Sequence, residues 1–222
     1  MGTGVPILMT TDAILTLAQL LSPAFPVGAF SYSHGLEAAH EAGDVMNAAD
    51  LEAWLRDVIA NGAGRNDAIF LAAAFGTEDA DEIGRIDALA CAMTPSSERL
   101  METVNQGRAF VTTAQAVWDV ALPARCYPVA VGQSARAMGL PLDATVTLYL
   151  QAFVANIASA GVRLIPLGQT DGQRIVAQLA GLCTETAKEA QLSALDDLGG
   201  ATVLADIRSL QHETQYTRLY RS

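Results

Sequence analysis

The sequence predicts an all-α protein. Its 222 residues are 51% hydrophobic but only 6% aromatic, and Ala and Leu, which favour helices, make up the bulk of the apolar residues. Residues 144–162 carry no charged side chain, and Val146, Leu150, Phe153 and Ile157 recur at the three- and four-residue steps of a helix face. We therefore expect a single-domain helical bundle of about nine to ten helices, with a flexible C-terminal tail.

A membrane span is the alternative for residues 144–162, because about 20 apolar residues suffice to cross a bilayer. Polar side chains such as Thr145, Gln151 and Asn156 lie all round this helix, however, and no cluster of Lys or Arg flanks it. We expect a core helix and no membrane.

The net charge, the cysteines and the start of the chain limit which partners and which cellular compartment we expect. The net charge of −11 repels nucleic-acid phosphate and anionic lipid, so proteins or cations are the expected partners, with no nucleic acid. Cys91, Cys126 and Cys183 lie far apart in the sequence, which suggests buried, reduced thiols rather than a metal or redox motif. The start of the chain lacks a basic segment and a cleavage site, and we expect a cytoplasmic protein.

The first half of the chain predicts a loose start over residues 1–9 and then a short helix that ends at Ser22 and Pro23. Residues 22–37 combine prolines, glycines and aromatics, which indicates a loop held in one shape before a helix that ends near Gly43. Asn47 should cap a helix that stops by Gly62, and a further helix runs to Gly76. The acids between residues 78 and 87 indicate a solvated helix face.

The second half predicts a long helix capped by Thr94 and Pro95, in which Gly107 indicates the close approach of another group. Its expected buried stripe consists of Leu100, Val104, Gly107, Val111, Ala114 and Trp118. A helix ending at Gly139 follows, then the central helix between Pro141 and Pro166.

Thr170 and Gln173 then predict a capping box for one more helix. We expect residues 1–192 to form the helical domain. Residues 193–222 should form a linker, with Gly199 and Gly200, and a partner-binding tail.

Candidate chemistry is sparse. His34, Glu37 and Glu41 could share a helix face and bind a transition metal, although surface or cap roles explain them as well. The sequence contains no nucleophile elbow, and Gly28 lies outside any phosphate-loop pattern. The tail is unusual, because Tyr216, Arg218, Tyr220 and Arg221 are residue types that dominate binding hot spots. A tail folded back on its own domain is the alternative.

Four segments resemble one family: SPAFPVGAFSYSHGLEAAHEAG from Ser22, GRAF from Gly107, YLQAFVANIASAGVRLIPLGQTDGQR from Tyr149 and RSLQHETQYTRLYRS from Arg208. They resemble the UreF family of urease accessory proteins in the same order along the chain. The resemblance implies a helical, cytoplasmic, non-catalytic protein without a cofactor, commonly a homodimer. Its implied partners are UreD (also called UreH), the GTPase UreG and, through the complex, apo-urease, whose nickel centre the complex assembles.

The expected partner-binding residues follow from these segments, with no catalytic or metal-ligating residue among them. They are Pro26, Gly28, Phe30, Ser31, Tyr32, Gly35, Glu37, Arg163, Gln169, Arg208, His212, Glu213, Tyr216, Arg218, Tyr220 and Arg221. Two other readings stay open: a small helical enzyme with a polar site around Arg163 and Gln169, and a helical nickel-binding protein that uses His34 and Glu37.

Overall fold

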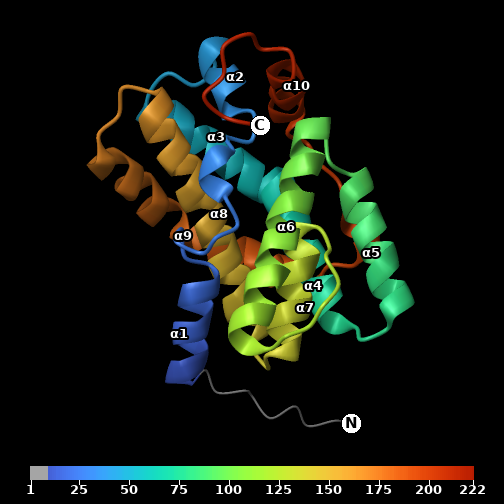
Figure 1. The fold of residues 1–222 in the computed structure, drawn as a ribbon. Helices are drawn as coiled ribbons and strands as arrows, with labels where there is room; N and C mark the ends of the chain where they lie inside the picture. Colours follow the sequence, from blue (N-terminus) through green and yellow to red (C-terminus); the bar gives the residue numbers. More distant parts are fainter. Residues whose placement is uncertain (1–9) are drawn as a thin grey trace.

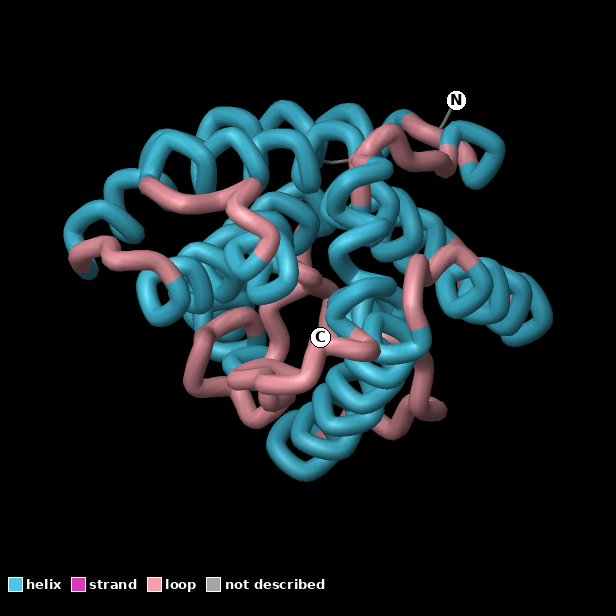
Figure 2. The backbone as a smooth tube through the Cα atoms, turned by 90° about the horizontal axis from the view of Figure 1, so that it is seen from above, coloured by secondary structure: helices cyan, strands magenta, loops and turns pink. Residues whose placement is uncertain are grey.

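The computed structural model describes residues 10–222, so the loose start expected for residues 1–9 lies outside them. The described residues contain helices and loops and no strand, which confirms the all-α prediction (Figure 2). The α-helices are α1 (Thr11–Leu20), α2 (Leu36–Glu41), α3 (Ala48–Asn61), α4 (Ala63–Gly76), α5 (Ala80–Ala92), α6 (Ser97–Trp118), α7 (Tyr127–Ala137), α8 (Leu142–Leu164), α9 (Gln169–Leu192) and α10 (Val203–His212). Two 3₁₀ turns, η1 (Ala29–Ser31) and η2 (Leu195–Asp197), lie in the connections.

Helix α8 is the centre of the bundle, as predicted. It contacts α9, α4, α3 and α7, and also α1 and α2 (Figure 1). Val146, Leu150, Val154 and Ile157 are fully buried along one stripe. By length and composition α8 could cross a membrane, but more than half of its most apolar stretch is buried inside the protein. Burial by neighbouring helices therefore accounts for the lack of charge over residues 144–162.

Several helix ends match their predicted signals. The Asn47 side chain accepts hydrogen bonds from the backbone N–H groups of Ala49 and Asp50 at the start of α3. Gly139 has a φ of +64° after α7, a left-handed conformation that suits glycine. Pro141 immediately precedes α8. Local capping chemistry thus fixes these boundaries from the sequence alone.

Two caps were predicted wrongly. Helix α6 is capped by Ser96, whose Oγ accepts from the Arg99 N–H, so Thr94 and Pro95 precede the helix. The Thr94 hydroxyl instead donates to the Cys91 carbonyl at 2.8 Å. Helix α9 was expected to begin with a capping box of Thr170 and Gln173. It begins instead after Gly168, whose N–H donates to the Asp171 carboxylate.

The predicted buried stripe of α6 is wrong in its first half. Leu100 is 37% exposed, whereas Glu98, Arg99, Glu102 and Gln106 are buried. These polar side chains bond to one another, to His34 and to the C-terminal segment, which offsets the cost of burying them.

The prediction for Gly107 is confirmed. A Cβ atom at this position would lie 1.9 Å from the carbonyl oxygen of Arg125, so glycine lets the segment before α7 pass against α6.

Helix α5 exposes its acidic face as predicted and packs Ile83, Ile86 and Ala90 into a second apolar cluster. Cys126 belongs to this cluster, and Cys183 is buried in the main core. Burial raises the pKa of the Cys183 thiol to about 11 and also raises that of Cys126. Cys91 is only half-buried, however, and lies beside Cys126 despite their separation in the sequence.

The predicted linker lies against the domain. The Ala201 N–H donates to the Asn61 carbonyl at 2.9 Å, and the Arg65 side chain donates to the Asp197 carbonyl at 2.8 Å. Within the segment predicted as linker and tail, Val203–His212 form helix α10. The structure gives the C-terminal segment a docked position on the domain, and its flexibility stays a prediction.

Candidate functional site

The loop predicted at residues 22–37 meets the C-terminal segment at one end of the molecule, where α2, α10 and the last residue lie together (Figure 1). Gly35 makes this meeting possible. Its φ is +77°, and a Cβ atom there would lie 2.8 Å from the backbone nitrogen of Ser209 in α10. The turn conformation and the close helix crossing both require glycine at this position.

Backbone hydrogen bonds join the loop to the end of the chain. The Ser33 N–H donates to the Ser222 carbonyl at 2.8 Å, and the Arg221 N–H donates to the Ser31 carbonyl at 2.9 Å. The Ser33 hydroxyl donates to the same Ser222 oxygen at 2.5 Å. The loop and the last residues of the chain therefore form one folded unit.

Glu37 supplies the acceptors at the centre of this unit. Its carboxylate accepts from the N–H groups of Leu219 at 2.6 Å and Tyr220 at 2.9 Å. Its Oε2 also lies 3.1 Å from Nε2 of His212. A single side chain from α2 thus orders the last turn of the chain, through charge-assisted hydrogen bonds.

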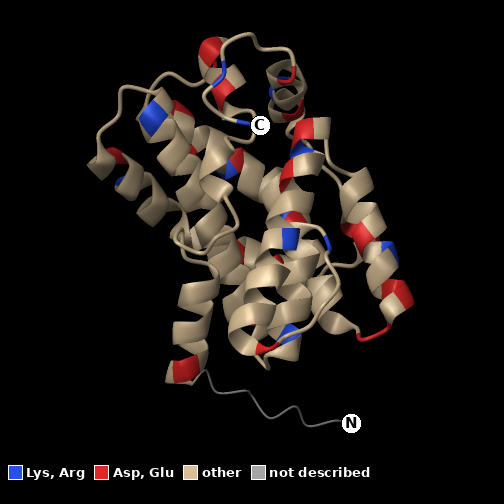
Figure 3. Ribbon diagram, in the orientation of Figure 1, with Lys and Arg blue, Asp and Glu red and all other residues tan. Residues whose placement is uncertain are grey.

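His212 is completely buried between two carboxylates. Besides Glu37, its Nδ1 lies 2.6 Å from Oε2 of Glu98 at the start of α6. Arg218 forms an ion pair with the other Glu98 oxygen. Acidic and basic residues lie close together at this end of the molecule (Figure 3). The buried charges are paired with one another, as their removal from water demands.

Further contacts hold α10 to the rest of the domain. The hydroxyls of Ser96 and Ser209 lie 2.7 Å apart, and Arg208 pairs with Asp44 at 2.5 Å. Glu213 accepts from the backbone and the hydroxyl of Ser97, and these hydrogen bonds lower the pKa of the Glu213 carboxyl. Helix α10 is consequently fixed along its inner face.

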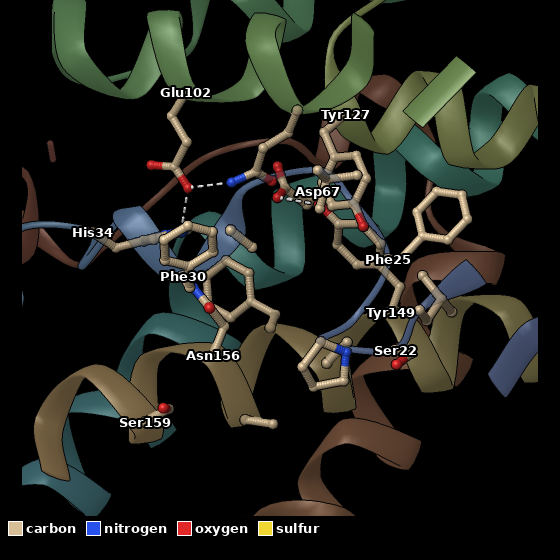
Figure 4. A pocket seen from close by; sticks show the side chains of 18 of the residues that line it. Ser22, Phe25, Phe30, His34, Asp67, Glu102, Tyr127, Tyr149, Asn156 and Ser159 are labelled. Carbon is tan, nitrogen blue, oxygen red and sulfur yellow. Dashed lines mark hydrogen bonds and ion pairs between the residues drawn. The ribbon is translucent and has the colours of Figure 1, made fainter. Parts of the chain in front are cut away.

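Ser222 connects this cluster to a second polar network, formed by Glu102, Arg99 and His34. The Ser222 hydroxyl donates to Glu102 at 2.7 Å, and Glu102 also forms an ion pair with Arg99. Figure 4 shows the contact of Glu102 with Nε2 of His34. Burial opposes ionisation of Glu102, but Arg99 and His34 outweigh it and lower the pKa of this carboxyl to about 2. Burial, reinforced by Arg99, lowers the pKa of His34. The network therefore holds an ionised Glu102 against Arg99.

His34, Arg99 and Glu102 line a cavity of about 290 Å³ between the loop, α6 and α8. Asp67 lies across it and accepts a 2.8 Å hydrogen bond from the Tyr149 hydroxyl. Burial raises the pKa of Asp67 to about 6. Arg163 lines the mouth of the cavity and donates to the Phe30 carbonyl at 3.4 Å. The cavity thus has a mainly apolar lining with a few polar groups, and these are largely paired with one another.

The predicted partner-binding residues differ in how far the structure buries them. Gly35, Glu37, His212 and Tyr220 are buried and hold the loop and the chain end together, and Tyr32 is also buried. Gly28, Ser31, Arg208 and Glu213 are half-buried beside them. The exposed residues are Pro26, Phe30, Arg163, Gln169, Tyr216, Arg218 and Arg221.

Exposed apolar side chains continue along the outer face of α10. The set comprises Val203, Leu204, Ile207, Leu210, Tyr216 and Leu219, each at least 43% exposed. We call this set the α10–tail surface. Tyr216 has no burial at all, with a relative exposure of 102%. Several exposed apolar side chains on one helix and the segment that follows it are typical of a protein interface.

The hypothesis that His34 and Glu37 bind a metal from one helix face is wrong. His34 precedes α2 and has a φ of +57°, so it does not share the helix face of Glu37. His34 contacts Glu102 and Arg99, whereas Glu37 contacts His212 and backbone amides. The two side chains belong to separate networks.

The polar site suggested around Arg163 and Gln169 is not assembled either. Arg163 lines the cavity, but Gln169 is exposed at the start of α9 and is not among the lining residues. The two side chains therefore do not line the same cavity.

The sequence analysis missed Glu98, Arg99, Glu102 and Ser222. Their signal was present, because Glu98, Glu102 and Gln106 repeat at four-residue steps on one face of α6. Such a polar stripe reads as solvent-exposed unless its buried partners from other helices are known.

Comparison with known proteins identifies one family. The family model described as UreF matches residues 45–180. A urease accessory protein UreF from Roseobacter denitrificans is 49% identical over 97% of this chain and 97% of its own length. The proteins of the same name from Ruegeria pomeroyi and Rhodopseudomonas palustris (strain BisB18) are 48% and 50% identical. They cover 96% and 95% of this chain, and 98% and 92% of their own lengths.

Proposed function

The chain belongs to the UreF family of urease accessory proteins, and from this premise we propose that it is a non-catalytic scaffold in urease maturation. In this role it binds the accessory protein UreD (UreH) and the GTPase UreG. The complex delivers nickel to apo-urease and regulates the GTP-dependent step. The proposed setting is the cytoplasm, and the proposed oligomeric state is a homodimer.

The α10–tail surface is the observation that carries this proposal. It places an aromatic ring and several aliphatic side chains in solvent, on a segment fixed from behind by His212 and Tyr220. Interfaces are enriched in such aromatic and Arg residues. Because the backbone is already ordered, binding there would cost less conformational entropy than binding of a disordered tail. We assign this surface to UreD.

A second exposed pair supports a separate contact with UreG. Phe30 is 66% exposed, and the Arg163 guanidinium reaches its carbonyl. Arg163 is the only charged residue between Asp143 and Asp171. A guanidinium at a surface suits charge-assisted contact with carboxylate or phosphate groups on a GTPase.

Co-purification tests the assignment to UreD. The double variant Tyr216→Ala/Leu219→Ala should lose UreD and, with it, UreG and urease activation, while its circular dichroism spectrum stays unchanged. Leu192→Ala is the matched control, because Leu192 is 90% exposed at the end of α9, away from this surface. Undiminished UreD binding by the double variant would mean that the interface lies elsewhere.

A further inference from the structure

Three side chains with metal-binding atoms meet where α5 ends and α7 begins. Asp87 and Cys91 are four residues apart on α5 and so project from the same face. Cys126 directly precedes α7. One carboxylate oxygen and the two sulfur atoms all lie within 4.8 Å of one another. Among residues 10–222 this is the one group of three or more such side chains so arranged.

The backbone around this group is held in place. The Cys126 N–H donates to Asp87 Oδ1 at 2.8 Å, and the Tyr127 N–H donates to Thr103 Oγ1 at 3.1 Å. Gly107 lets the Arg125 carbonyl approach α6 so closely that a Cβ atom there would lie 1.9 Å from it. Three helices therefore fix the relative positions of the three side chains, as a preorganised site requires.

The spacing suits one tetrahedral ion. With Zn–S bonds of about 2.3 Å and Zn–O bonds of about 2.0–2.2 Å, ligand atoms around a tetrahedral ion lie roughly 3.5–3.8 Å apart. The three ligand atoms lie within 4.8 Å of one another, so side-chain rotations that move each atom by about 1 Å would bring them to the tetrahedral spacing. Cys91 is half-buried, so water can reach the fourth position.

The charges are also complementary. Two thiolates and one carboxylate carry three negative charges, which a divalent ion and the neighbouring Arg125 would balance. The Arg125 guanidinium lies 3.3 Å from Asp87 Oδ2 and so orients the carboxylate. Cys126 stands at the N-terminus of α7. Burial and the neighbouring Asp87 carboxylate raise the pKa of its thiol, so binding of the ion would release the thiol protons. Sulfur ligands with one oxygen favour a thiophilic ion without geometric demands of its own.

We propose that Asp87, Cys91 and Cys126 bind one Zn²⁺ ion, which ties α5 to the start of α7. This site is separate from the α10–tail surface and from the nickel that the maturation complex handles, so its test does not depend on the proposed scaffold role.

Titration of the reduced full-length chain with Co²⁺ and Zn²⁺ tests the proposal. The wild-type protein should bind one Co²⁺ per chain with a near-ultraviolet thiolate-to-cobalt absorption band, and Zn²⁺ should displace it. Cys91→Ser should weaken binding by at least about 100-fold, since loss of a ligand exceeds the 10–100-fold cost of losing its outer partners. Cys183→Ala, which alters a buried thiol elsewhere, should bind as the wild type does.

Asp87→Asn provides a variant that keeps the fold, because the amide oxygen can still accept from the Cys126 N–H. It should bind Co²⁺ about 10-fold or more weakly and keep the thiolate band. Zn²⁺ should raise the melting temperature of the wild type and not that of Cys91→Ser. The proposal is overturned if the wild type shows no thiolate band or if Cys91→Ser binds as tightly. A Cys91–Cys126 disulfide in protein kept under reducing conditions would overturn it too.

Discussion

Glu37 and His212, 175 residues apart in the sequence, are joined by a contact of 3.1 Å between Oε2 and Nε2. The imidazole lies between this carboxylate and that of Glu98, and all three side chains are buried. Removing one member of a buried ionic cluster leaves its partners uncompensated, which costs far more than the cluster contributes to stability. This arrangement makes the docked position of the C-terminal segment testable.

His212→Ala should lower the free energy of unfolding by about 3–5 kcal/mol, because two carboxylates would face each other in the interior. Hydrogen exchange at the Leu219 and Tyr220 amides should become fast, since Glu37 would no longer be held in place. Tyr216→Ala is the control and should leave both measurements unchanged. Equal protection of the two amides in His212→Ala and wild type would show that the segment does not depend on this contact.

Gly35→Ala should destabilise the protein more than Gly28→Ala does. Both glycines have a positive φ, which costs a non-glycine residue about 1–2 kcal/mol. Only at Gly35 does a Cβ atom also meet backbone, 2.8 Å from Ser209 N, whereas nothing lies within 4 Å of a Cβ at Gly28. Thermal unfolding measures the difference, and UreD binding should weaken in Gly35→Ala alone, because α10 must shift. Equal losses in the two variants would contradict the close crossing.

Asp67→Asn should stabilise the protein progressively more as the pH rises from 4 to 7. Asp67 has a folded pKa of about 6, above its ordinary value of 3.8, so the folded state holds this proton more tightly than the unfolded state. Wild-type stability from this group is therefore present at low pH and is lost as the pH rises through about 6.

Between these pH values, the free energy of unfolding of Asp67→Asn should rise relative to that of the wild type by at most about 3 kcal/mol, because each unit of pKa shift corresponds to about 1.36 kcal/mol. Solvent in the cavity reduces this value. Denaturant unfolding of both proteins at several pH values measures it. A pH-independent difference would show that Asp67 has an ordinary pKa.

Gly107→Ala and Gly84→Ala should have effects of opposite sign. Both glycines lie within helices, where alanine gains up to about 1 kcal/mol in propensity. A Cβ at Gly84 meets nothing within 4 Å, whereas one at Gly107 overlaps the Arg125 carbonyl. Gly84→Ala should therefore raise the melting temperature and Gly107→Ala should lower it. A stabilised Gly107→Ala would mean that the segment before α7 can move away at little cost.

Arg163→Ala should change the melting temperature little, because the side chain is exposed and its contacts are long, 3.4 Å to the Phe30 carbonyl and 3.5 Å to the Ser159 hydroxyl. Its effect should appear in UreG binding instead, with Arg163→Lys intermediate, because lysine keeps the charge without the planar donors. A drop of many degrees would assign Arg163 to the structure rather than to a partner surface.

The sequence by itself determined the helices. The stripe of Val146, Leu150 and Ile157 specified the buried central helix, since burial on most sides excludes charge from any position. Asn47 and Gly139 marked helix ends, because capping uses groups within a few residues. Gly107 indicated a close approach without indicating of what. These signals are local and need no knowledge of the fold.

Only the tertiary structure decided the site. The burial of Glu98 and Glu102 was not predicted, because it depends on His212 and Ser222, which arrive from the other end of the chain. Cys91 and Cys126 appeared unrelated until the segment before α7 crossed α6 at Gly107. A buried polar group is stable only with its partners in place. Its role therefore depends on the assembled fold and cannot be predicted from the periodicity of one segment.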